Sequence, residues 1–477
     1  MVKTDKSFLL FTAALGLALR LSHLFLTAKD PYYTILYGDT EYFEKAARGL
    51  ADGTLKHQLL EATLSPVYLW FNGLIYKIFG PQPLAVRIIQ SLLGALQPLL
   101  FYAAARKVWG PSAGKTASLL AAASGILIFY DAEILKPSLI HVLFALLVWN
   151  IVSEKVWFWP RWVLSGFLFG CLALLRMNFL AALPFLAVWI AVYGTAGKFK
   201  LRAGAAAVFL AVFALTWAGW TNWLDHSAPN RAASDVQLGI HFYIGNNDDT
   251  EGVYKPVKGV RSTAIGHNLD AREIAERNSR RALTDREVNS YWISRGLYFI
   301  REHPLQWLAL EGKKLFLLFN DYEVPGPDHF DLMRTRSPVL ALPLPGFGLI
   351  AALGGLGIFL TWKQRKKTEL LLLGFFFFYV LSLLLFFIRA DYRMPLCIPL
   401  ILFAGAAVER ITEFFRTQNI RALKISSAVF LVLFVFTHIQ TFLPRNHFFM
   451  VGERRLQSRQ VETGFPAAQQ FPAPFSQ

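Results

Sequence analysis

Residues 38–53 read GDTEYFEKAARGLADG and follow the first long apolar run of the chain. This segment places two carboxylates, Asp39 and Glu41, just beyond a predicted membrane boundary. Apolar residues recur at helical spacing from Ala46 to Leu50, which predicts a short amphipathic helix that begins near Asp39. One interpretation of Asp39 is a helix cap, because a carboxylate at a helix N-terminus is stabilised by backbone N–H groups and the helix dipole. The alternative is a functional carboxylate, and the rest of the chain bears on that choice.

The composition predicts an all-α polytopic membrane protein. Of 477 residues, 55% are hydrophobic and only 17% are charged, and a soluble domain could not keep that much apolar surface out of water. Cys171 and Cys397 lie in apolar stretches, so no disulfide framework is expected. The net charge of +16 suits cytoplasmic loops and lipid headgroups, and no nucleic acid partner is implied.

Apolar runs of spanning length predict a bundle of about 11 transmembrane helices. The first run follows Lys3 and Lys6 and lacks a small-residue cleavage site, so we interpret it as an uncleaved anchor. The predicted spans are Phe8–Leu26, Leu84–Ala105, Ala117–Tyr130, Leu139–Val152, Trp162–Leu175, Phe179–Tyr193, Ala203–Leu224, Val339–Trp362, Leu370–Ile388, Met394–Val408 and Ile425–Phe442.

Basic residues assign the two sides of the membrane. If the N-terminal lysines are cytoplasmic, Lys and Arg collect in alternate loops, as the positive-inside rule requires. These inside loops contain Arg106-Lys107, Lys155, Lys198–Arg202, Lys363–Lys367 and Arg410–Lys424. Asp39 is then predicted to lie outside, at the periplasmic face of a bacterial inner membrane.

The same threading divides the chain into four parts. We expect an N-terminal catalytic membrane module (1–224) that includes the first outer loop (27–83), an outer segment (225–337), C-terminal membrane helices (338–442) and an outer tail (443–477). The first loop includes Ser65–Gly80, which suits an interfacial or re-entrant helix. In the outer segment, Ala271–Arg301 has helical spacing, and Pro304–Phe319 predicts an amphipathic helix on the membrane surface.

Several charged residues lie at predicted membrane depth, where charge is costly. Each cation alone could extend to lipid headgroups, but several at one level, facing carboxylates, suit an anionic headgroup such as a phosphate. These cations are Arg87, Arg176, Arg389 and Arg393, and Lys313 and Lys314 on the predicted amphipathic helix could add to them.

Other polar groups have plainer interpretations. Glu133 either is functional or pairs with Lys136 on the next turn. Residues 245–252 are oxygen-rich but lack the spacing of a calcium-binding loop, so a turn is expected. The histidines of the outer segment lack zinc-ligand spacing. No metal ligand or cofactor is therefore assigned, although a divalent metal is left open.

Taken in order, the motifs resemble those of GT-C glycosyltransferases, the membrane enzymes that use polyprenyl-phosphate sugars. The similar branch includes the protein O-mannosyltransferases and the lipid A aminoarabinose transferases. The motifs are Asp39 with Tyr42, Ala46 and Gly53; Ser65–Tyr68; Phe79-Gly80; Ala85–Gln90; Tyr130–Glu133; Leu175–Asn178; Gly245–Asn247; Gly252–Tyr254; and Asp391–Leu396.

The resemblance implies roles for individual residues. Asp39 matches the catalytic base of the family, and Glu133 or Asp131 matches its second acidic residue. Some relatives have adjacent acidic residues in the first loop, whereas Thr40 stands between Asp39 and Glu41 here. The expected donor-phosphate contacts are Arg87, Lys314, Arg389 and Arg393, and the expected substrate contacts are Glu41, Tyr42, Asp131, Arg176 and Asn246.

The predicted reaction is inverting sugar transfer from a polyprenyl-phosphate donor to a hydroxyl or phosphate acceptor on lipid A, another glycan or a protein. The leaving phosphate needs little protonation, so one carboxylate suffices as the base. The alternative is a transporter or flippase of lipid-linked glycans. Against it, the polar groups gather at one face, and no inverted repeat is visible.

Overall fold

Apolar helices account for most of the structure. The computed structural model describes residues 3–36, 38–55, 65–153, 158–194, 199–227, 234–261, 264–326, 329–364 and 366–439. The helices that form the membrane bundle and the first loop are α1 (Lys3–Thr27), α2 (Pro31–Thr34), α3 (Asp39–Ala51), α5 (Pro66–Phe79), α6 (Pro83–Trp109), α7 (Pro111–Ala123), α8 (Gly125–Ala132), α9 (Pro137–Val152), α10 (Phe158–Leu175), η1 (Met177–Ala182), α11 (Leu183–Tyr193) and α12 (Phe199–Ser227). The rest are α13 (Ser234–Gly245), α14 (Ala264–Ser279), α15 (Asp285–Glu302), α16 (Pro304–Phe319), α17 (Phe330–Arg336), α18 (Phe347–Thr361), α19 (Lys367–Leu384), α20 (Ala390–Arg393), η2 (Met394–Leu396), α21 (Cys397–Arg416) and α22 (Ile420–His438).

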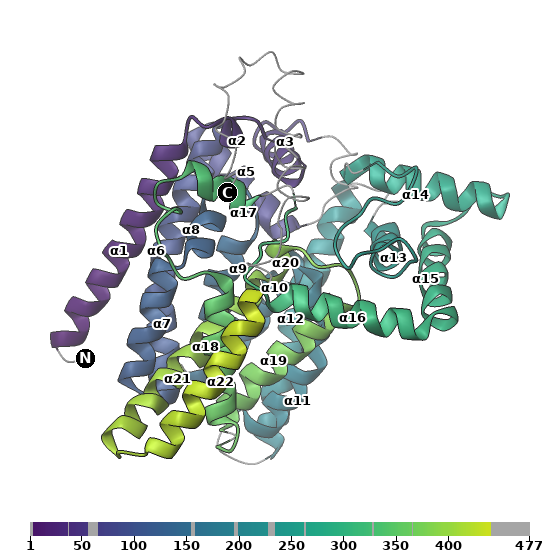
Figure 1. Cartoon of the computed structure of the whole chain (residues 1–477). Coiled ribbons are helices and arrows are strands. Elements are labelled where there is room, and N and C mark those ends of the chain that lie inside the picture. Colours follow the sequence, from purple (N-terminus) through teal and green to yellow (C-terminus); the bar gives the residue numbers. More distant parts are fainter. Residues whose placement is uncertain are drawn as a thin grey trace, which may run out of the picture.

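The long helices run side by side as a bundle (Figure 1). Among the described residues, seven helices are long and apolar enough to cross a membrane, or eight if α7 and α8, which meet at 49°, form one broken span. The described residues include no β-strand, and one isolated parallel bridge joins Val253 to Ile388. The predicted all-α polytopic membrane protein is thereby confirmed.

The predicted spans coincide with helices of this bundle. Eight of them fall on the seven long helices and the α7–α8 pair. The other three fall on shorter apolar helices of 10–17 residues, namely α9, η1 with α11, and α18. The predicted start of the span at Val339 is wrong, because α18 begins at Phe347. Pro343 and Pro345 lie just before it and lack the N–H groups that a helix interior requires.

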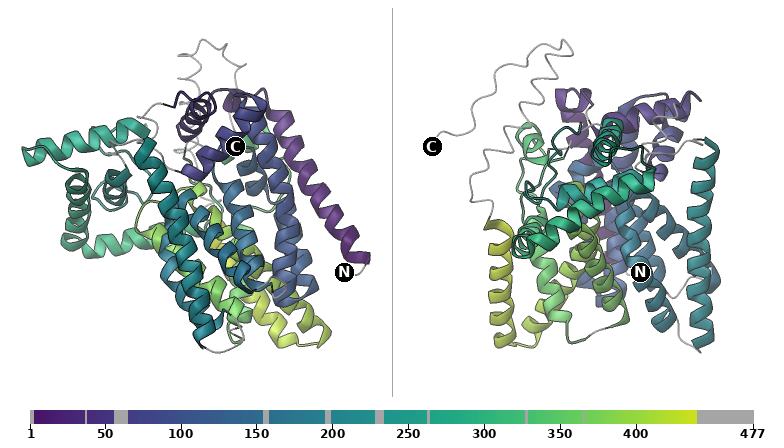
Figure 2. Two further views of the ribbon diagram at one scale, coloured as in Figure 1. Left: turned by 180° about the vertical axis from the view of Figure 1, so that it is seen from behind. Right: turned by 90° about the vertical axis from the view of Figure 1, so that its right-hand side faces the viewer.

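Helices α13–α16, here called the side lobe, stand beside one end of the bundle (Figures 1 and 2). The stretch 271–301, predicted to be helical, is divided between α14 and α15, and residues 280–284 separate the two helices. The predicted amphipathic helix is confirmed as α16, with the expected bounds. The lobe has its own small core of Ile240, Ile244, Ala271, Ala275, Leu283, Val288 and Trp292, which is joined by Phe387 from the segment after α19. A residue of the membrane bundle thus completes the core of the lobe.

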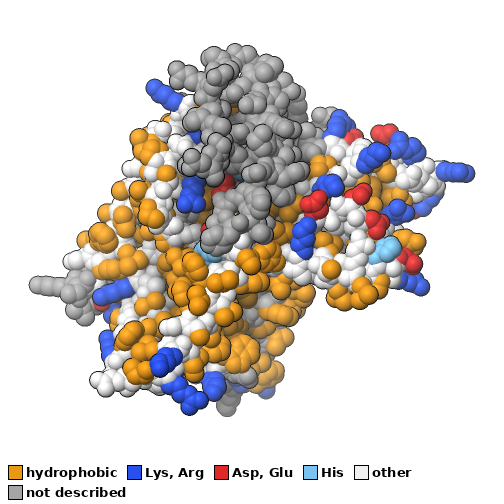
Figure 3. All heavy atoms as spheres, in the orientation of Figure 1, with side chains coloured by type: hydrophobic (Ala, Val, Ile, Leu, Met, Phe, Trp, Pro, Cys, Tyr) orange, Lys and Arg blue, Asp and Glu red, His pale blue; other side chains and the backbone are white. Residues whose placement is uncertain are grey.

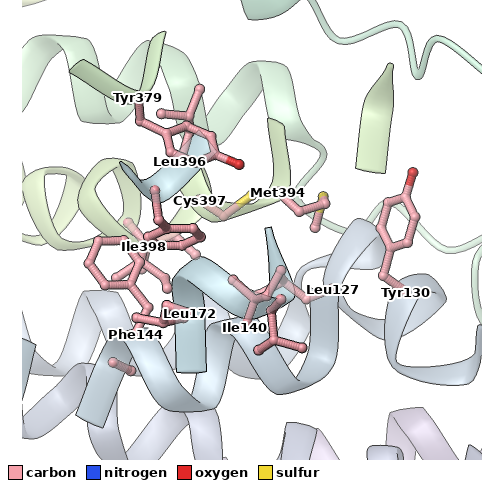
Figure 4. Packing of buried hydrophobic residues seen from close by; sticks show 14 of the residues in the cluster. Leu127, Tyr130, Ile140, Phe144, Leu172, Tyr379, Met394, Leu396, Cys397 and Ile398 are labelled. Carbon is pink, nitrogen blue, oxygen red and sulfur yellow. The ribbon is translucent and has the colours of Figure 1, made fainter. Parts of the chain in front are cut away.

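A large apolar core holds the bundle together. In Figure 4, side chains of α9, α10 and α21 point toward one another, among them Phe144, Leu172 and Ile398, which are 2% exposed or less. Hydrophobic side chains also cover much of the outer surface, as Figure 3 shows, which is the pattern of a helix bundle that contacts lipid.

The two ends of the bundle differ in what they carry. The α18–α19 and α21–α22 connections, which contain predicted inside charges, lie at the lower end in Figure 1, whereas α3, α17 and the side lobe lie toward the upper end. The segments predicted to share one side of the membrane therefore do share one end of the molecule. The predicted outer tail, residues 443–477, lies outside the described residues.

Candidate active site

Helix α3 places Asp39 at the upper end of the bundle. Gly38, with φ +59°, occupies the left-handed region that favours glycine and sits at the N-cap position, so Asp39 is the first residue of the helix. The buried face of α3 packs against α5, where the rings of Phe43 and Tyr68 meet edge to face at 4.8 Å. The interpretation of Asp39 as the helix cap is therefore wrong, because Gly38 takes that position.

The carboxylate of Asp39 faces Arg389, 350 residues later. Its Oδ2 accepts a hydrogen bond of 3.3 Å from Nη2 of Arg389, and its side chain is 26% exposed. Arg389 itself is only 7% exposed. The pair thus joins a reachable carboxylate to a nearly buried guanidinium.

Asp391 links Arg389 to a second arginine. Its Oδ1 accepts a hydrogen bond of 3.0 Å from Nε of Arg389, and its Oδ2 accepts one of 2.9 Å from Nη2 of Arg176, at the end of α10. Both guanidinium groups also lie over the ring of Tyr392, with Cζ 4.4 Å (Arg176) and 4.8 Å (Arg389) from its centroid. Two arginines and two carboxylates therefore form one cluster, here called the Asp39 cluster: Asp39, Arg176, Arg389 and Asp391.

Backbone contacts fix the segment that carries Arg389. The N–H of Ile388 donates to the carbonyl of Gly252 at 2.8 Å, and the N–H of Ala390 donates to the carbonyl of Val324 at 3.0 Å. A Cβ at Gly326 would lie 2.8 Å from the Arg389 guanidinium, so a larger residue there would shift that side chain. The position of Arg389 is therefore set by the side lobe as well as by the bundle.

Lys136, between α8 and α9, contacts α3, the helix that begins at Asp39. Its Nζ is 5.7 Å from the centroid of the Phe43 ring. Burial and the nearby Arg176 guanidinium lower the pKa of Lys136 to about 7, although Asp39 and Asp391 act in the opposite direction. Within the described part of the chain, no carboxylate lies within 4.0 Å of its ammonium group, so the alternative that Glu133 pairs with Lys136 is wrong.

His241 of α13 brings the side lobe to the same place. Its ring lies 5.1 Å from that of His267 and 5.7 Å from that of Phe387. Burial, with help from His267 and from the cations Arg389 and Lys136, lowers the pKa of His241 to about 3. The imidazole is therefore neutral at physiological pH, and it packs against Phe387, two residues before Arg389.

Arg87 and Glu133 form a separate, buried group next to the first loop. Arg87 donates a hydrogen bond of 3.0 Å to the carbonyl of Tyr33, and its Cζ lies 4.6 Å from the centroid of the Tyr33 ring. Glu133 is 3% exposed, and its carbonyl accepts a hydrogen bond of 2.6 Å from Gln90. The structure does not bring either residue into the Asp39 cluster.

Asp131 is buried on the other side of the α8 terminus. Its Oδ2 pairs with Nε of Arg20 at 2.7 Å, and both side chains are 0% exposed. Arg20 also donates to the carbonyls of Ala121 and Ala122 at the end of α7. This pair joins α1 to the broken span, and the structure places Asp131 apart from Asp39.

Three of the predicted contacts bind backbone carbonyls instead. Lys314 donates to the carbonyl of Leu384 at 2.9 Å and pairs with Glu311 at 2.6 Å. Asn246 donates to the carbonyl of Leu385 at 2.9 Å. Arg393 donates to four carbonyls, those of Leu317, Leu318, Asn320 and Tyr322, and pairs with Glu323 at 2.6 Å. These side chains hold the segment around Arg389 in place.

The remaining two predicted contacts lie on α3. Glu41 pairs with Lys45 at 2.7 Å along the helix surface. Tyr42 is 6% exposed, and its ring meets that of Phe43 at 5.4 Å. In the parts of the chain that the structure describes, no three His, Cys, Asp or Glu side chains gather as a group able to hold a metal ion.

The site prediction missed Asp391, which belongs to the Asp39 cluster, and the nearby residues Tyr392 and Lys136. Asp391 and Tyr392 belong to a motif of the family resemblance, so sequence could have identified them. Lys136 gave a weaker signal, since a lysine between two apolar helices is usually interpreted as a headgroup contact.

Part of the chain matches the model of a known protein family. Residues 63–220, about a third of the chain, match the family model of the dolichyl-phosphate-mannose-protein mannosyltransferases. No curated protein sequence matches the chain. Over this part of the chain, the match agrees with the resemblance to GT-C glycosyltransferases that the motifs indicate.

Solved structures with a similar arrangement have low identity. The archaeal oligosaccharyltransferase AglB from Archaeoglobus fulgidus, in complex with an inhibitory peptide and a dolichol-phosphate, is 13% identical with a TM-score of 0.45, and the match covers 100% of this chain and 61% of that one. ArnT from Cupriavidus metallidurans, bound to undecaprenyl phosphate, is 14% identical with a TM-score of 0.38, covering 87% and 79%. This chain thus spans about three fifths of the length of the archaeal enzyme.

Proposed function

We propose that this protein transfers a sugar from a polyprenyl-phosphate donor to a hydroxyl or phosphate acceptor, with inversion, and that Asp39 is the base. The observation that carries the proposal is the contact between Asp39 and Arg389. It places a carboxylate with 26% of its side chain exposed against a cation that is itself anchored by Asp391. Asp131 and Glu133, the other acids considered, are at most 3% exposed.

The chemistry needs one base and a set of cations. Asp39 takes the proton of the acceptor O–H as the oxygen bonds to the anomeric carbon, and the bond from that carbon to the phosphate oxygen breaks. The electron pair leaves with the polyprenyl phosphate, which gains a negative charge. Arg389 and the neighbouring Arg176 are placed to stabilise that charge by charge-assisted hydrogen bonds. A general acid is unnecessary, because phosphate is already a good leaving group.

The cluster draws on both halves of the chain. Asp39 and Arg176 come from the N-terminal module (1–224), whereas Arg389 and Asp391 come from the C-terminal helices (338–442). We infer that the two modules form one site at the extracytoplasmic face, where a donor dissolved in the membrane and an acceptor outside it can meet. Placement in a bacterial inner membrane, with the site facing the periplasm, is part of this proposal.

Purified protein and a panel of polyprenyl-phosphate sugars provide the direct test. The expected result is release of polyprenyl phosphate that depends on an added glycan, lipid or protein acceptor. A protein that moves the intact lipid-linked sugar across vesicles but never cleaves it would instead support the transporter alternative. The grouping of charges at one end of the bundle favours the transferase, since transporter sites lie near the bilayer midplane.

Arg389 and Arg393 are expected to respond differently to substitution. Arg389→Ala should weaken donor affinity by about 1.5–3 kcal/mol, the value of a hydrogen bond to a charged group. Its Tm should change little, because Asp391 keeps its pair with Arg176 at 2.9 Å. Arg393→Ala should lower the Tm strongly, since it leaves the buried Glu323 without its cation. Donor titrations and thermal melts of both variants check these expectations. Equal donor affinity for Arg389→Ala and wild type would show that Arg389 does not bind the donor.

Single cysteines test the proposed orientation. Thr250→Cys, in the loop after α13, should react with a membrane-impermeant maleimide in intact cells. Lys363→Cys, in the α18–α19 connection, should react only after lysis. Background labelling should be low, because Cys171 and Cys397 are buried. The opposite labelling pattern would place the Asp39 cluster at the cytoplasmic face.

A further inference from the structure

We propose that the side lobe docks on the lipid bilayer through one face of α16 and the end of α15. Apolar side chains enter the leaflet at this end of the bundle, which is the outer leaflet in the proposed orientation, and exposed cations meet its anionic headgroups. The sequence predicts only that α16 is amphipathic and lies on the membrane surface. The structure adds the face that α16 presents, the part that α15 contributes and the class of lipid that both fit.

The apolar side of α16 points away from the protein. Leu305, Leu308 and Leu315 are 80%, 58% and 41% exposed, and their spacing places them on one side of the helix. At the end of α15, Leu297 and Tyr298 are 53% and 61% exposed. These five residues are here called the docking face. Apolar patches of this kind mark surfaces that bind a partner or a membrane.

Contacts with two spans place α16 at the membrane boundary. The Phe316 ring lies 5.6 Å from that of Phe436, in the last turn of α22, and the Phe319 ring lies 5.8 Å from that of Phe376 in α19. Both α22 and α19 are long and apolar enough to cross a membrane. Helix α16 runs across the long helices (Figures 1 and 2), and hydrophobic side chains line the lower edge of the side lobe in Figure 3. A bilayer around the bundle therefore extends beneath the side lobe.

The exposed charges around the docking face are mostly positive. Between residues 295 and 319, the exposed charged side chains are Arg295, Arg301, Glu302 and Lys313. The other acidic residue of this stretch, Glu311, is half-buried and pairs with the buried Lys314. Three exposed cations and one exposed carboxylate fit anionic phospholipid headgroups, which attract basic residues near the bilayer surface.

The opposite side of α16 holds the segment that carries Arg389. The side chain of Lys314 is 0% exposed, and its Nζ donates to the carbonyl of Leu384 at 2.9 Å. The carbonyls of Leu317 and Leu318 accept hydrogen bonds from Arg393. Helix α16 thus contacts lipid on one side and the Arg389 segment on the other. Docking of the lobe therefore also sets how far that segment lies from the bilayer.

The experiment measures the depth of nitroxide labels on full-length protein in lipid nanodiscs that hold one or two copies. Single labels are attached to Leu305→Cys or Leu308→Cys. The control Leu269→Cys places the same label on α14, where Leu269 is 57% exposed against 58% for Leu308. Labelling of Cys171 and Cys397 should be low, because both are buried. Depth is obtained from collision rates with oxygen, which enters the bilayer, and with a nickel chelate, which stays in water.

The labels on α16 are expected inside the bilayer. In discs of phosphatidylcholine with phosphatidylglycerol, labels at positions 305 and 308 should lie about 5–10 Å below the headgroup surface, the usual depth of an interfacial helix. The label at position 269 should instead be in water. Two labelled positions on α16 and a thermal melt of each variant guard against a substitution that disturbs the lobe.

A second comparison tests the cations. The label at position 308 should lie deeper in the anionic discs than in discs of phosphatidylcholine alone, and Arg301→Gln with Lys313→Gln should abolish that difference. The matched control is Arg277→Gln with Lys258→Gln, which removes one exposed arginine from α14 and one exposed lysine from the loop before it. This control should keep the difference in depth.

Three results would overturn the proposal or part of it. If the nickel chelate reaches the labels at positions 305 and 308 as readily as the label at position 269, the lobe does not dock on the bilayer. If those labels are shielded only in discs that hold two copies, the docking face is a contact between copies of this chain. An equal depth in both kinds of disc would show that the cations do not bind headgroups. Sugar transfer is measured separately, by release of polyprenyl phosphate, so the proposed function can stand or fall independently.

Discussion

Asp39→Asn is expected to lower the rate of sugar transfer by about two to four orders of magnitude, the usual contribution of a positioned general base. The amide keeps the size of the carboxylate and an oxygen that can accept the hydrogen bond from Arg389, but it cannot take the acceptor's proton. Donor affinity should survive, since the base faces the acceptor and not the phosphate. The Tm should change little, because Gly38 and not Asp39 occupies the helix cap.

Asp52→Asn is the matched control for that substitution. Asp52 lies at the opposite end of α3, is exposed, and loses the same charge with the same change of atoms. Its transfer rate should stay within a few-fold of wild type. A folded Asp39→Asn protein with near-normal turnover would disprove the assignment, and Glu41 would become the next candidate because its side chain is 29% exposed.

Asp131→Asn is expected to act on stability instead. The substitution leaves the Arg20 guanidinium buried without its counter-charge, which typically costs about 3–5 kcal/mol. Both side chains are 0% exposed, so water cannot compensate. Thermal melts should show a large fall in Tm, while the rate of transfer per folded molecule should stay close to that of wild type.

The double substitution Arg20→Met with Asp131→Leu should recover much of that loss. Replacing both members of a buried ion pair by apolar side chains is often nearly neutral, although the carbonyls of Ala121 and Ala122 lose the donors that Arg20 supplied. If Asp131→Asn had normal stability but greatly reduced turnover, Asp131 would belong to the reaction, as the family resemblance implied.

The membrane helices could be predicted from sequence because apolar length and loop charge are local properties. The helices α3, α14, α15 and α16 were also predicted from their spacing. The start of α18 was predicted eight residues too early, because hydropathy does not register that Pro343 and Pro345 cannot donate backbone hydrogen bonds.

The site was only partly predictable, because its members are far apart in the chain. Asp39 and Arg389 meet through tertiary packing across 350 residues, and no spacing rule encodes that contact. The turn after α8 shows the same problem on a short scale. Asp131 pairs with Arg20 of α1, whereas Lys136, five positions later, lies over the Phe43 ring of α3. Glu133 between them has an extended backbone, so helical spacing does not apply there.

Arg389 and Arg393 illustrate a related limit. Four residues apart, they would share a face if both were inside a helix. Arg389 precedes α20 with an extended backbone, φ −137° and ψ 150°, whereas Arg393 ends it. One arginine therefore reaches Asp39, while the other binds carbonyls in the last turn of α16 and just after it.

The attachment of the side lobe to the Arg389 segment has a consequence for chimeric proteins. Phe387 completes the core of the lobe, the carbonyls of Leu384 and Leu385 bind Lys314 and Asn246, and the N–H of Ile388 binds Gly252. If only residues 234–319 were exchanged between related proteins, the new lobe would lack its own version of residues 384–388, the segment that it contacts. An exchange of the lobe between related chains should therefore move residues 384–388 together with residues 234–319.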